Sequence, residues 1–235
     1  MNEKIRAIID QYSDTPEKAL DKMALIAEYL KEQSAKFNLT SLKTDEEIAA
    51  LHFLDSLSFF QSGVVKSGDK IADIGCGAGF PSLVIAARDD TLDVTAVDST
   101  AKKIEYVRSC AEYAGIKNIK AIAGRAEELS AESGFRGKFD IATARSVASL
   151  NILCELCIPF VKKGGFFVAM KGSRGYEEYV ESKNAITALG AEFIEIKDVR
   201  IPIAEHDHTL VIIKKIADTN EKYPRPYSKI IKKPL

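Results

Sequence analysis

Residues 70–81 read KIADIGCGAGFP, and this stretch decides the fold that we expect for the chain. An apolar run at 70–74 leads directly into glycines at alternate positions, Gly75, Gly77 and Gly79. Glycine lets the backbone turn sharply and approach a ligand closely at the junction of a buried strand and a helix. The stretch therefore predicts a ligand-binding loop at the carboxyl end of a parallel strand.

Short apolar runs alternate with helical stretches on the carboxyl side of that loop. This alternation is typical of βαβ units, in which a parallel sheet carries helices on both faces. The last two runs have alternating β-branched residues and no helical stretch between them, so we expect an antiparallel hairpin at the sheet edge. The predicted strands are KIADIG (70–75), LDVTAVD (92–98), IKAIAG (119–124), FDIATA (139–144), GGFFVAMKG (164–172), AEFIEIKDVRIP (191–202) and HTLVIIKKI (208–216).

The residues before this sheet are predicted to be helical. A threonine followed by proline at 15–16 is a cap with a first-turn proline, and a capping-box pattern at Thr44 and Glu47 precedes the apolar run of residues 48–60. The prolines and lysines near the end of the chain argue against regular structure there. We therefore expect a helical cap at 1–66, a Rossmann-like α/β domain with a seven-stranded sheet at 67–217, and a basic tail at 218–235.

Composition narrows the class of protein. A hydrophobic content of 46% suits a globular core, and a net charge of -1 gives no overall bias toward a polyanion. No apolar run reaches the roughly 18 residues of a membrane span, so we expect a cytoplasmic protein. Cys154 and Cys157 lie in an apolar run, which favours buried helix thiols over a redox pair or half a zinc site. His52, His206 and His208 lack metal-ligand spacing, so no metal is expected.

The spacing of the glycine loop points to a particular kind of ligand. The loop reads GxGxG after Asp73, whereas loops that bind a dinucleotide pyrophosphate read GxGxxG. The tighter loop suits a ligand that lacks a pyrophosphate, and methionine joined to adenosine fits that description. A simple chain reversal is the alternative for a glycine triplet. Asp98 ends the next strand, where a carboxylate can accept hydrogen bonds from ribose hydroxyls. The third and fourth strands end at 124–128 and 144–146, so four strand ends predict one pocket.

Several elements of the sequence together resemble the bacterial RsmG family, also called glucose-inhibited division protein B. The resemblance covers roughly residues 25–235 and rests on Asn38-Leu39-Thr40, His52-Phe53-Leu54-Asp55-Ser56-Leu57, the glycine loop, Val97-Asp98-Ser99, residues 124–128, residues 144–148 and Tyr223-Pro224-Arg225. That family transfers a methyl group from S-adenosylmethionine to N7 of the guanine at position 527 of 16S ribosomal RNA. The resemblance implies a class I methyltransferase whose partner is 16S RNA or the small ribosomal subunit.

The resemblance also assigns site residues. It places cofactor contacts at Gly75, Phe80, Ala126, Glu127 and Arg145, with Asp98 as the ribose-binding acid. The full predicted cofactor set is Asp73, Gly75, Gly77, Gly79, Phe80, Asp98, Ala126, Glu127 and Arg145, and the predicted catalytic set is Asn38, Arg125, Arg145 and Lys171. Ser82 and Ser146 stand where the family usually has glycine and alanine, and because both are small we expect the loop geometry to survive.

Arginine and lysine suit this substrate because a guanidinium can grip phosphate or the O6 edge of guanine, and an ammonium can contact phosphate. For Arg125 and Arg145 the alternative is a salt bridge with Glu127 or Glu128. Guanine N7 carries a free lone pair, so the reaction requires positioning rather than a general base.

The last segment interleaves basic residues with Tyr223 and Tyr227, a pattern that suits phosphate contact and base stacking, with a solvated tail as the alternative. These basic residues are Lys214, Lys215, Lys222, Arg225, Lys229, Lys232 and Lys233. Two other functions stay open: a methyltransferase for a small molecule or protein, and a non-catalytic nucleotide-binding or RNA-binding module. We expect a monomer.

Overall fold

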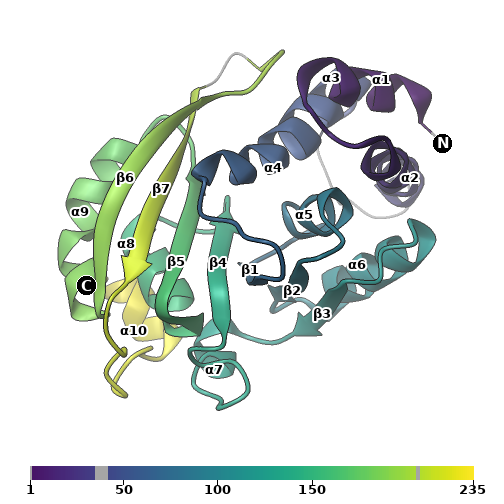
Figure 1. The fold of residues 1–235 in the computed structure, drawn as a ribbon. Helices are drawn as coiled ribbons and strands as arrows, with labels where there is room; N and C mark the ends of the chain where they lie inside the picture. Colours follow the sequence, from purple (N-terminus) through teal and green to yellow (C-terminus); the bar gives the residue numbers. More distant parts are fainter. Residues whose placement is uncertain (1, 35–41, 205–206) are drawn as a thin grey trace.

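The computed structural model describes residues 2–34, 42–204 and 207–235, so Asn38 and His206 lie outside the described residues. A seven-stranded sheet in the order β3-β2-β1-β4-β5-β7-β6 forms its centre, with helices on both faces (Figure 1). The strands are β1 (Lys70–Ile74), β2 (Asp93–Asp98), β3 (Ile119–Ala123), β4 (Phe139–Arg145), β5 (Val161–Lys171), β6 (Ala191–Arg200) and β7 (Asp207–Lys215).

The pairing of the strands follows the predicted alternation. β1 pairs in parallel with β2 and β4, β2 pairs in parallel with β3, and β4 pairs in parallel with β5. β7 runs antiparallel to both β5 and β6, which makes β6 the edge strand of the predicted hairpin. The seven predicted strands and the terminal hairpin are therefore confirmed.

Side chains of the central strands are buried on both faces, because successive residues of a strand point to opposite sides. Ile71 packs in the core cluster on one face, and Ala72 packs in the cluster on the other. The first face is covered by α5 (Ser82–Arg88), α6 (Ala101–Tyr113) and the helices before β1. The second face carries α8 (Leu150–Cys157), η3 (Ile158–Phe160), α9 (Gly175–Ala188) and α10 (Tyr227–Lys232), and the short α7 (Ala126–Leu129) follows β3.

The helices before the sheet share its core. They are α1 (Glu3–Tyr12), α2 (Glu17–Ser34), α3 (Asp45–Ile48), the π-helical η1 (Ala49–Leu54), α4 (Asp55–Leu57) and the 3-10 helix η2 (Ser58–Ser62). The predicted capping box is present at α3, where Thr44 Oγ1 accepts from Glu47 N at 3.1 Å and Glu47 Oε2 accepts from Thr44 N at 3.0 Å. From α3 to η2 the chain stays helical and mostly buried, as the apolar run predicts.

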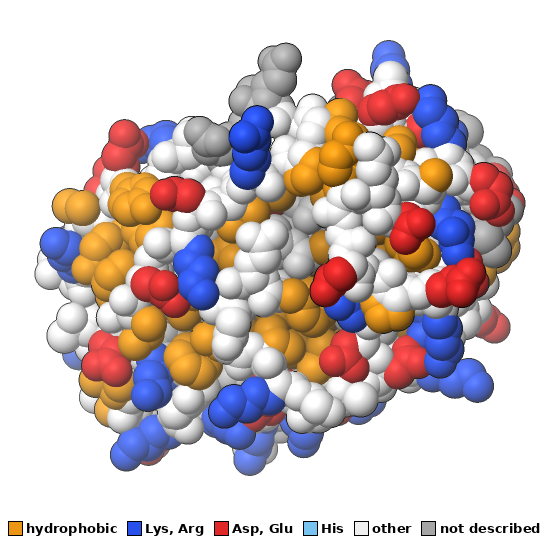
Figure 2. Space-filling view, turned by 45° about the horizontal axis from the view of Figure 1, so that its top comes forward, with side chains coloured by type: hydrophobic (Ala, Val, Ile, Leu, Met, Phe, Trp, Pro, Cys, Tyr) orange, Lys and Arg blue, Asp and Glu red, His pale blue; other side chains and the backbone are white. Residues whose placement is uncertain are grey.

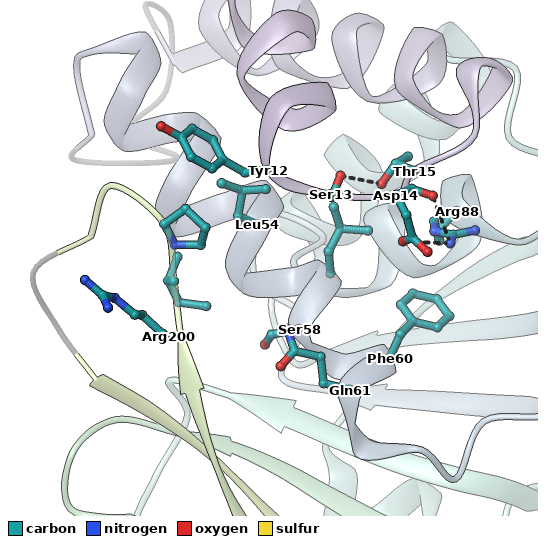
Figure 3. Close-up of a pocket in the computed structure, with 13 residues that line it drawn as sticks. Tyr12, Ser13, Asp14, Thr15, Leu54, Ser58, Phe60, Gln61, Arg88 and Arg200 are labelled. Atoms are coloured by element: carbon teal, nitrogen blue, oxygen red, sulfur yellow. Dashed lines mark hydrogen bonds and ion pairs between the residues drawn. The ribbon is translucent and has the colours of Figure 1, made fainter.

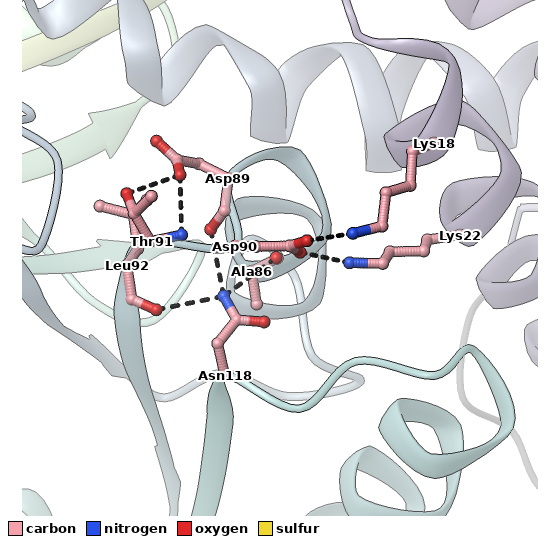
Figure 4. A network of polar contacts seen from close by, with 8 residues as sticks. All are labelled: Lys18, Lys22, Ala86, Asp89, Asp90, Thr91, Leu92 and Asn118. Atoms are coloured by element: carbon pink, nitrogen blue, oxygen red, sulfur yellow. Dashed lines mark hydrogen bonds and ion pairs between the residues drawn. The ribbon is translucent and has the colours of Figure 1, made fainter.

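Polar contacts attach α2 to the loop between α5 and β2 (Figure 4). Lys18 and Lys22 both pair with the carboxylate of Asp90. The side-chain amide of Asn118 lies 3.1 Å from each of three carbonyl oxygens of the same loop region, those of Ala86, Asp89 and Leu92. The loop is thus fixed from both sides, and α2 is fixed with it.

The expectation that residues 218–235 lack regular structure is wrong. They include α10, whose Ile230 is fully buried against the α8 side of the core. The guanidinium of Arg136 donates to the carbonyls of Thr219 at 2.8 Å and Tyr223 at 2.9 Å. The segment is rich in prolines and lysines, but the buried Ile230 and the hydrogen bonds from Arg136 hold it against the domain.

Two smaller expectations can be compared with the structure. Cys154 and Cys157 are free thiols buried in α8, so the prediction of buried helix thiols is confirmed. Among the described residues, no helix combines the length and apolar character needed to cross a membrane.

Candidate functional site

The glycine loop joins β1 to α5 in a conformation that needs glycine. Gly75 and Gly77 have φ values of 77° and 57°, in the left-handed region that disfavours other residues. The Gly75 N–H donates to the carbonyl of Val97 at 2.8 Å, and a Cβ at Gly75 would collide with the side chain of Val147. A Cβ at Gly77 would meet no described atom within 4 Å, so this part of the loop leaves room for a ligand to approach the backbone.

Asp73 sits beneath the loop and is completely buried. Its Oδ2 accepts from the backbone N–H of Ser82 at 3.0 Å, at the start of α5, and Ser82 is itself fully buried. Oδ1 has no hydrogen-bond partner among the described residues. Burial raises the pKa of Asp73 to about 6, because the charged carboxylate is poorly solvated there. The geometry makes Asp73 a support for the loop.

Asp98 ends β2 and is 8% exposed. One carboxylate oxygen accepts from Gly77 N at 3.1 Å and the other from Thr100 N at 2.8 Å, while Lys103 Nζ lies 3.7 Å away. A carboxylate has about four acceptor sites, so these bonds leave capacity for further donors such as ribose hydroxyls.

A cavity of about 380 Å³ lies where these elements meet. Its lining comes from the ends of β1, β2, β3 and β4, which are the four strand ends that the sequence places together. Its size falls within the range of roughly 300–1,000 Å³ that is usual for small-molecule sites. Leu156 of α8 and Tyr227 of α10 also line it, and neither was anticipated. The lining residues are Ile74, Gly75, Val97, Asp98, Ser99, Thr100, Lys103, Gly124, Arg125, Ala126, Glu127, Ser146, Val147, Leu156 and Tyr227.

A buried charge cluster adjoins the end of β4. Arg145 Nη1 donates to Asp55 Oδ2 at 2.6 Å and to the carbonyl of Leu51 at 2.9 Å. The other carboxylate oxygen of Asp55 lies 2.8 Å from His208 Nδ1. Burial opposes ionisation of Asp55, but His208 and Arg145 outweigh it and lower the pKa of the carboxyl group. Three distant parts of the chain are therefore held together by one carboxylate.

Phe80 of the glycine loop touches this cluster. The His52 ring stacks on Phe80 with 4.4 Å between centroids, and the Arg145 guanidinium carbon lies 5.8 Å from the centroid of the Phe80 ring. Burial and the charge of Arg145 lower the pKa of His52 to about 4, so the imidazole is neutral at pH 7. From the sequence, the roles of His52 and Asp55 stay open, with a local pairing on one helix face as one alternative, and the structure joins Asp55 to β4 and β7.

Arg125 and Lys171 are both engaged. Arg125 Nε lies 2.6 Å from Glu127 Oε1, which is the salt bridge that the sequence leaves open as the alternative, and its guanidinium lies 4.6 Å from the Tyr227 ring centroid. Lys171 is largely buried; its Nζ lies 2.8 Å from Glu178 Oε2 and 2.8 Å from the carbonyl of Ala148. Lys171 thus braces the loop after β4, and a direct catalytic role for either residue stays a prediction.

Two of the basic residues near the chain end face inward, contrary to the expected phosphate contacts. Lys215 is 4% exposed and its Nζ donates to the carbonyl of Ile158. Arg225 is held by the fully buried carboxylate of Glu155, with Nη2 at 2.6 Å from Oε2. Lys222, Lys229, Lys232 and Lys233 remain exposed.

A second cleft, of about 430 Å³, lies between the α1–α2 loop and the end of β6 (Figure 3). It contains none of the predicted cofactor residues, and its Asp14 carboxylate lies 3.4 Å from Arg88. Figure 2 shows that basic and acidic side chains are interspersed over the described part of one face of the molecule. No group of three metal-ligand side chains occurs among the described residues.

Comparison with known proteins gives matches over most of the chain. The family model described as rRNA small subunit methyltransferase G matches residues 19–207. The chain is 41% identical over 206 residues to the Ribosomal RNA small subunit methyltransferase G of Alkaliphilus metalliredigens, covering 88% of this chain and 86% of the relative. With the protein of that name from Clostridium perfringens strain 13 it is 40% identical over 237 residues, covering 96% and 99%.

Solved structures show the same fold at low sequence identity. M. jannaschii TYW2 in complex with AdoMet aligns with a TM-score of 0.55 at 14% identity, over 69% of this chain and 77% of that chain. Aeropyrum pernix fibrillarin with natively bound S-adenosyl-L-methionine aligns with a TM-score of 0.53 at 14% identity, over 68% and 76%. The expected Rossmann-like sheet of class I methyltransferases is therefore confirmed.

Proposed function

Because the chain belongs to the rRNA small subunit methyltransferase G family, we propose that it transfers a methyl group from S-adenosylmethionine to N7 of a guanine in 16S ribosomal RNA. The family resemblance identifies that guanine as position 527. One observation supports the proposal most directly: the carboxyl ends of β1 to β4 surround one cavity, and Arg145, which lies near the Phe80 ring, directly precedes the lining residue Ser146. We therefore place the acceptor site next to the cofactor cavity.

The residues around the cavity fit S-adenosylmethionine. The open backbone at Gly77 admits the cofactor, and the acceptor capacity of Asp98 suits two ribose hydroxyls. We assign the remaining contacts to Gly75, Ala126 and Glu127, which line the cavity, and to Phe80 and Arg145 from the neighbouring cluster, with Asp73 and Gly79 shaping the loop. When bound, the cofactor supplies a methyl group on a positively charged sulfur.

Arg145 is the residue that we place at the acceptor. A guanidinium has five N–H donors, and the hydrogen bonds of Arg145 to described residues use only those on Nη1. Asp55 fixes the orientation of the Arg145 side chain. The remaining N–H donors of Arg145 can therefore contact O6 of guanine without a further loss of rotamer freedom on binding. Guanine N7 attacks through its own lone pair, and the neutral, buried His52 is not required as a base.

The exposed lysines of the C-terminal segment are proposed to contact RNA phosphates. Lys229 and Lys232 lie on α10, whose first residue, Tyr227, lines the cavity, so their ammonium groups extend the site outward. Arg125 lines the same cavity. Lys171 is proposed to position the loop after β4, and Asn38 is retained as a catalytic candidate although it lies outside the described residues. We further propose that the protein acts as a cytoplasmic monomer on 16S RNA or on the small subunit.

Methyl transfer can be tested directly with purified protein, a radiolabelled methyl donor, and 16S RNA or small subunits that lack the modification. Nuclease digestion should then locate the label on N7 of one guanine in 16S RNA. An Arg145→Lys variant, which keeps the charge but loses the planar fork, should methylate more slowly while retaining its fold. Absence of label from both naked and assembled RNA, together with turnover on a small metabolite, would overturn the proposal.

A further inference from the structure

Residues 218–235 approach the cofactor cavity from the far end of the sheet. The last strand, β7, ends at Lys215 beside Ala191, while the cavity lies beyond the carboxyl ends of β1 to β4. After β7 the chain is held by Arg136, and α10 then packs on α8. This path brings the first residue of α10, Tyr227, to the cavity.

A buried ion pair fixes the path. Glu155 of α8 is fully buried, and its carboxylate accepts from Arg225 through the backbone N–H at 2.7 Å, Nε at 2.9 Å and Nη2 at 2.6 Å. Arg225 also donates from Nη1 to the carbonyl of Lys233 at 3.1 Å, across α10. Since Arg225 lies two residues before Tyr227, these bonds fix the backbone that leads into Tyr227 and the start of α10.

Tyr227 lines the cofactor cavity together with apolar side chains. Leu156, the neighbour of Glu155 in α8, lines the same cavity, as does Val97 of β2. The Arg125 guanidinium lies 4.6 Å from the Tyr227 ring centroid, and its charge is paired with Glu127. Tyr227 thus brings a planar aromatic ring to the cavity lining, and the charge of Arg125 beside it is paired with Glu127.

We propose that Tyr227 is a positioning residue for the cofactor, and that its ring packs against the purine of S-adenosylmethionine. The inference rests on the proposed function. Of the two ends of the cofactor, the purine is planar and can stack on an aromatic ring, whereas the amino-acid end carries two charges that need polar partners. The C-terminal segment is thereby a structural part of the cofactor site. Because coupling is reciprocal, bound cofactor should also hold the segment in place.

The chain contains no tryptophan, which provides a sharp test. A Tyr227→Trp variant has a single tryptophan at the cavity wall, and its emission should change on addition of S-adenosylmethionine. The change should saturate at the dissociation constant that calorimetry gives for the same variant. A Tyr12→Trp variant is the matched control, because Tyr12 is 44% exposed and lines the other cleft. Its emission should not respond to the cofactor.

Substitutions test the contribution of the ring itself. Tyr227→Ala should weaken cofactor binding about tenfold through loss of the stacking surface, and Tyr227→Phe should bind within about twofold of the parent. Cofactor should slow trypsin cleavage after the lysines of α10 in the parent and slow it less in Tyr227→Ala. If Tyr227→Ala fails to fold, the Tyr227→Phe and Tyr227→Trp results decide.

The outcomes separate the two proposals. A folded parent that does not bind S-adenosylmethionine contradicts the proposed function. A parent that binds, combined with parent-like affinity in Tyr227→Ala or a silent Tyr227→Trp signal, contradicts only the role of Tyr227.

Discussion

Arg225→Ala is predicted to destabilise the protein strongly, because it leaves the Glu155 carboxylate without its ionic partner. Glu155 is fully buried, and of the four hydrogen bonds that its carboxylate accepts from Arg225 only the one from the backbone N–H would survive. Removing one member of a buried ion pair costs about 3 to 5 kcal/mol. For a chain of this size 1 kcal/mol shifts Tm by about 2 to 4 °C, so Tm should fall by about 6 to 20 °C.

Thermal unfolding followed by circular dichroism measures this effect, and Arg174→Ala is the matched control. Arg174 forms an ion pair with Glu177 in which both side chains are 68% exposed, so its loss should shift Tm very little. If the segment detaches instead, Ile230 loses its burial and trypsin should cleave at the exposed lysines. Equal Tm values for Arg225→Ala and Arg174→Ala, with unchanged proteolysis, would refute the reasoning.

Three further predictions concern the cofactor, the RNA and pH. Asp98→Ala should weaken S-adenosylmethionine binding, measured by calorimetry, by about 1.5 to 3 kcal/mol, the range for hydrogen bonds to charged groups. RNA affinity should stay unchanged. Poor RNA binding with normal cofactor affinity would contradict the assignment of Asp98 to the ribose hydroxyls. Replacing Lys229, Lys232 and Lys233 together by alanine should make RNA affinity less dependent on salt and leave cofactor binding unchanged. The slope of log affinity against log salt should become shallower by up to about 0.7 for each phosphate that is no longer neutralised. An unchanged slope would show that these lysines do not contact RNA. Burial and the charge of Arg136 lower the pKa of Lys215 to about 8, so between pH 8 and 10.5 the unfolded chain binds a proton that the folded chain has released, and stability should rise with pH across this window. Urea unfolding at pH 8 and 10.5 should show a smaller increase in the free energy of unfolding in Lys215→Met than in the parent. An identical increase in the two proteins would contradict this assignment to Lys215.

The sheet could be predicted because each of its strands leaves a local signal in the sequence. Parallel strands buried on both faces are short apolar runs, and the run at 70–74 is directly followed by glycines whose φ values other residues disfavour. The position of Asp98 at the cavity could be predicted for a similar reason, since its separation in sequence from Gly75 follows from the length of one strand–helix–strand unit. Such features depend on short stretches of chain.

Contacts between distant segments could not be predicted in this way. Asp55 and Arg145 are 90 residues apart, and their 2.6 Å contact depends on how α4 is placed over the sheet, which no local pattern encodes. A signal was nevertheless present, because Asp55 is the acidic residue of the mostly apolar run at 48–60, and a buried carboxylate needs a partner. The position of Tyr227 was missed for the same reason, although Ile230, three residues later, indicates a helix with one buried face.

The direction of β7 also bears on the order in which the site is completed during synthesis. A final strand parallel to β5 would have released the chain at the cavity, whereas the antiparallel β7 releases it at the opposite end. Domains are made from the amino terminus onward, so Gly75, Asp98 and Glu127 emerge from the ribosome long before Tyr227. A nascent chain therefore has the glycine loop and the acidic strand end before it has the last wall of the cavity, and full cofactor affinity should appear only after β7 has paired and the following segment has turned back.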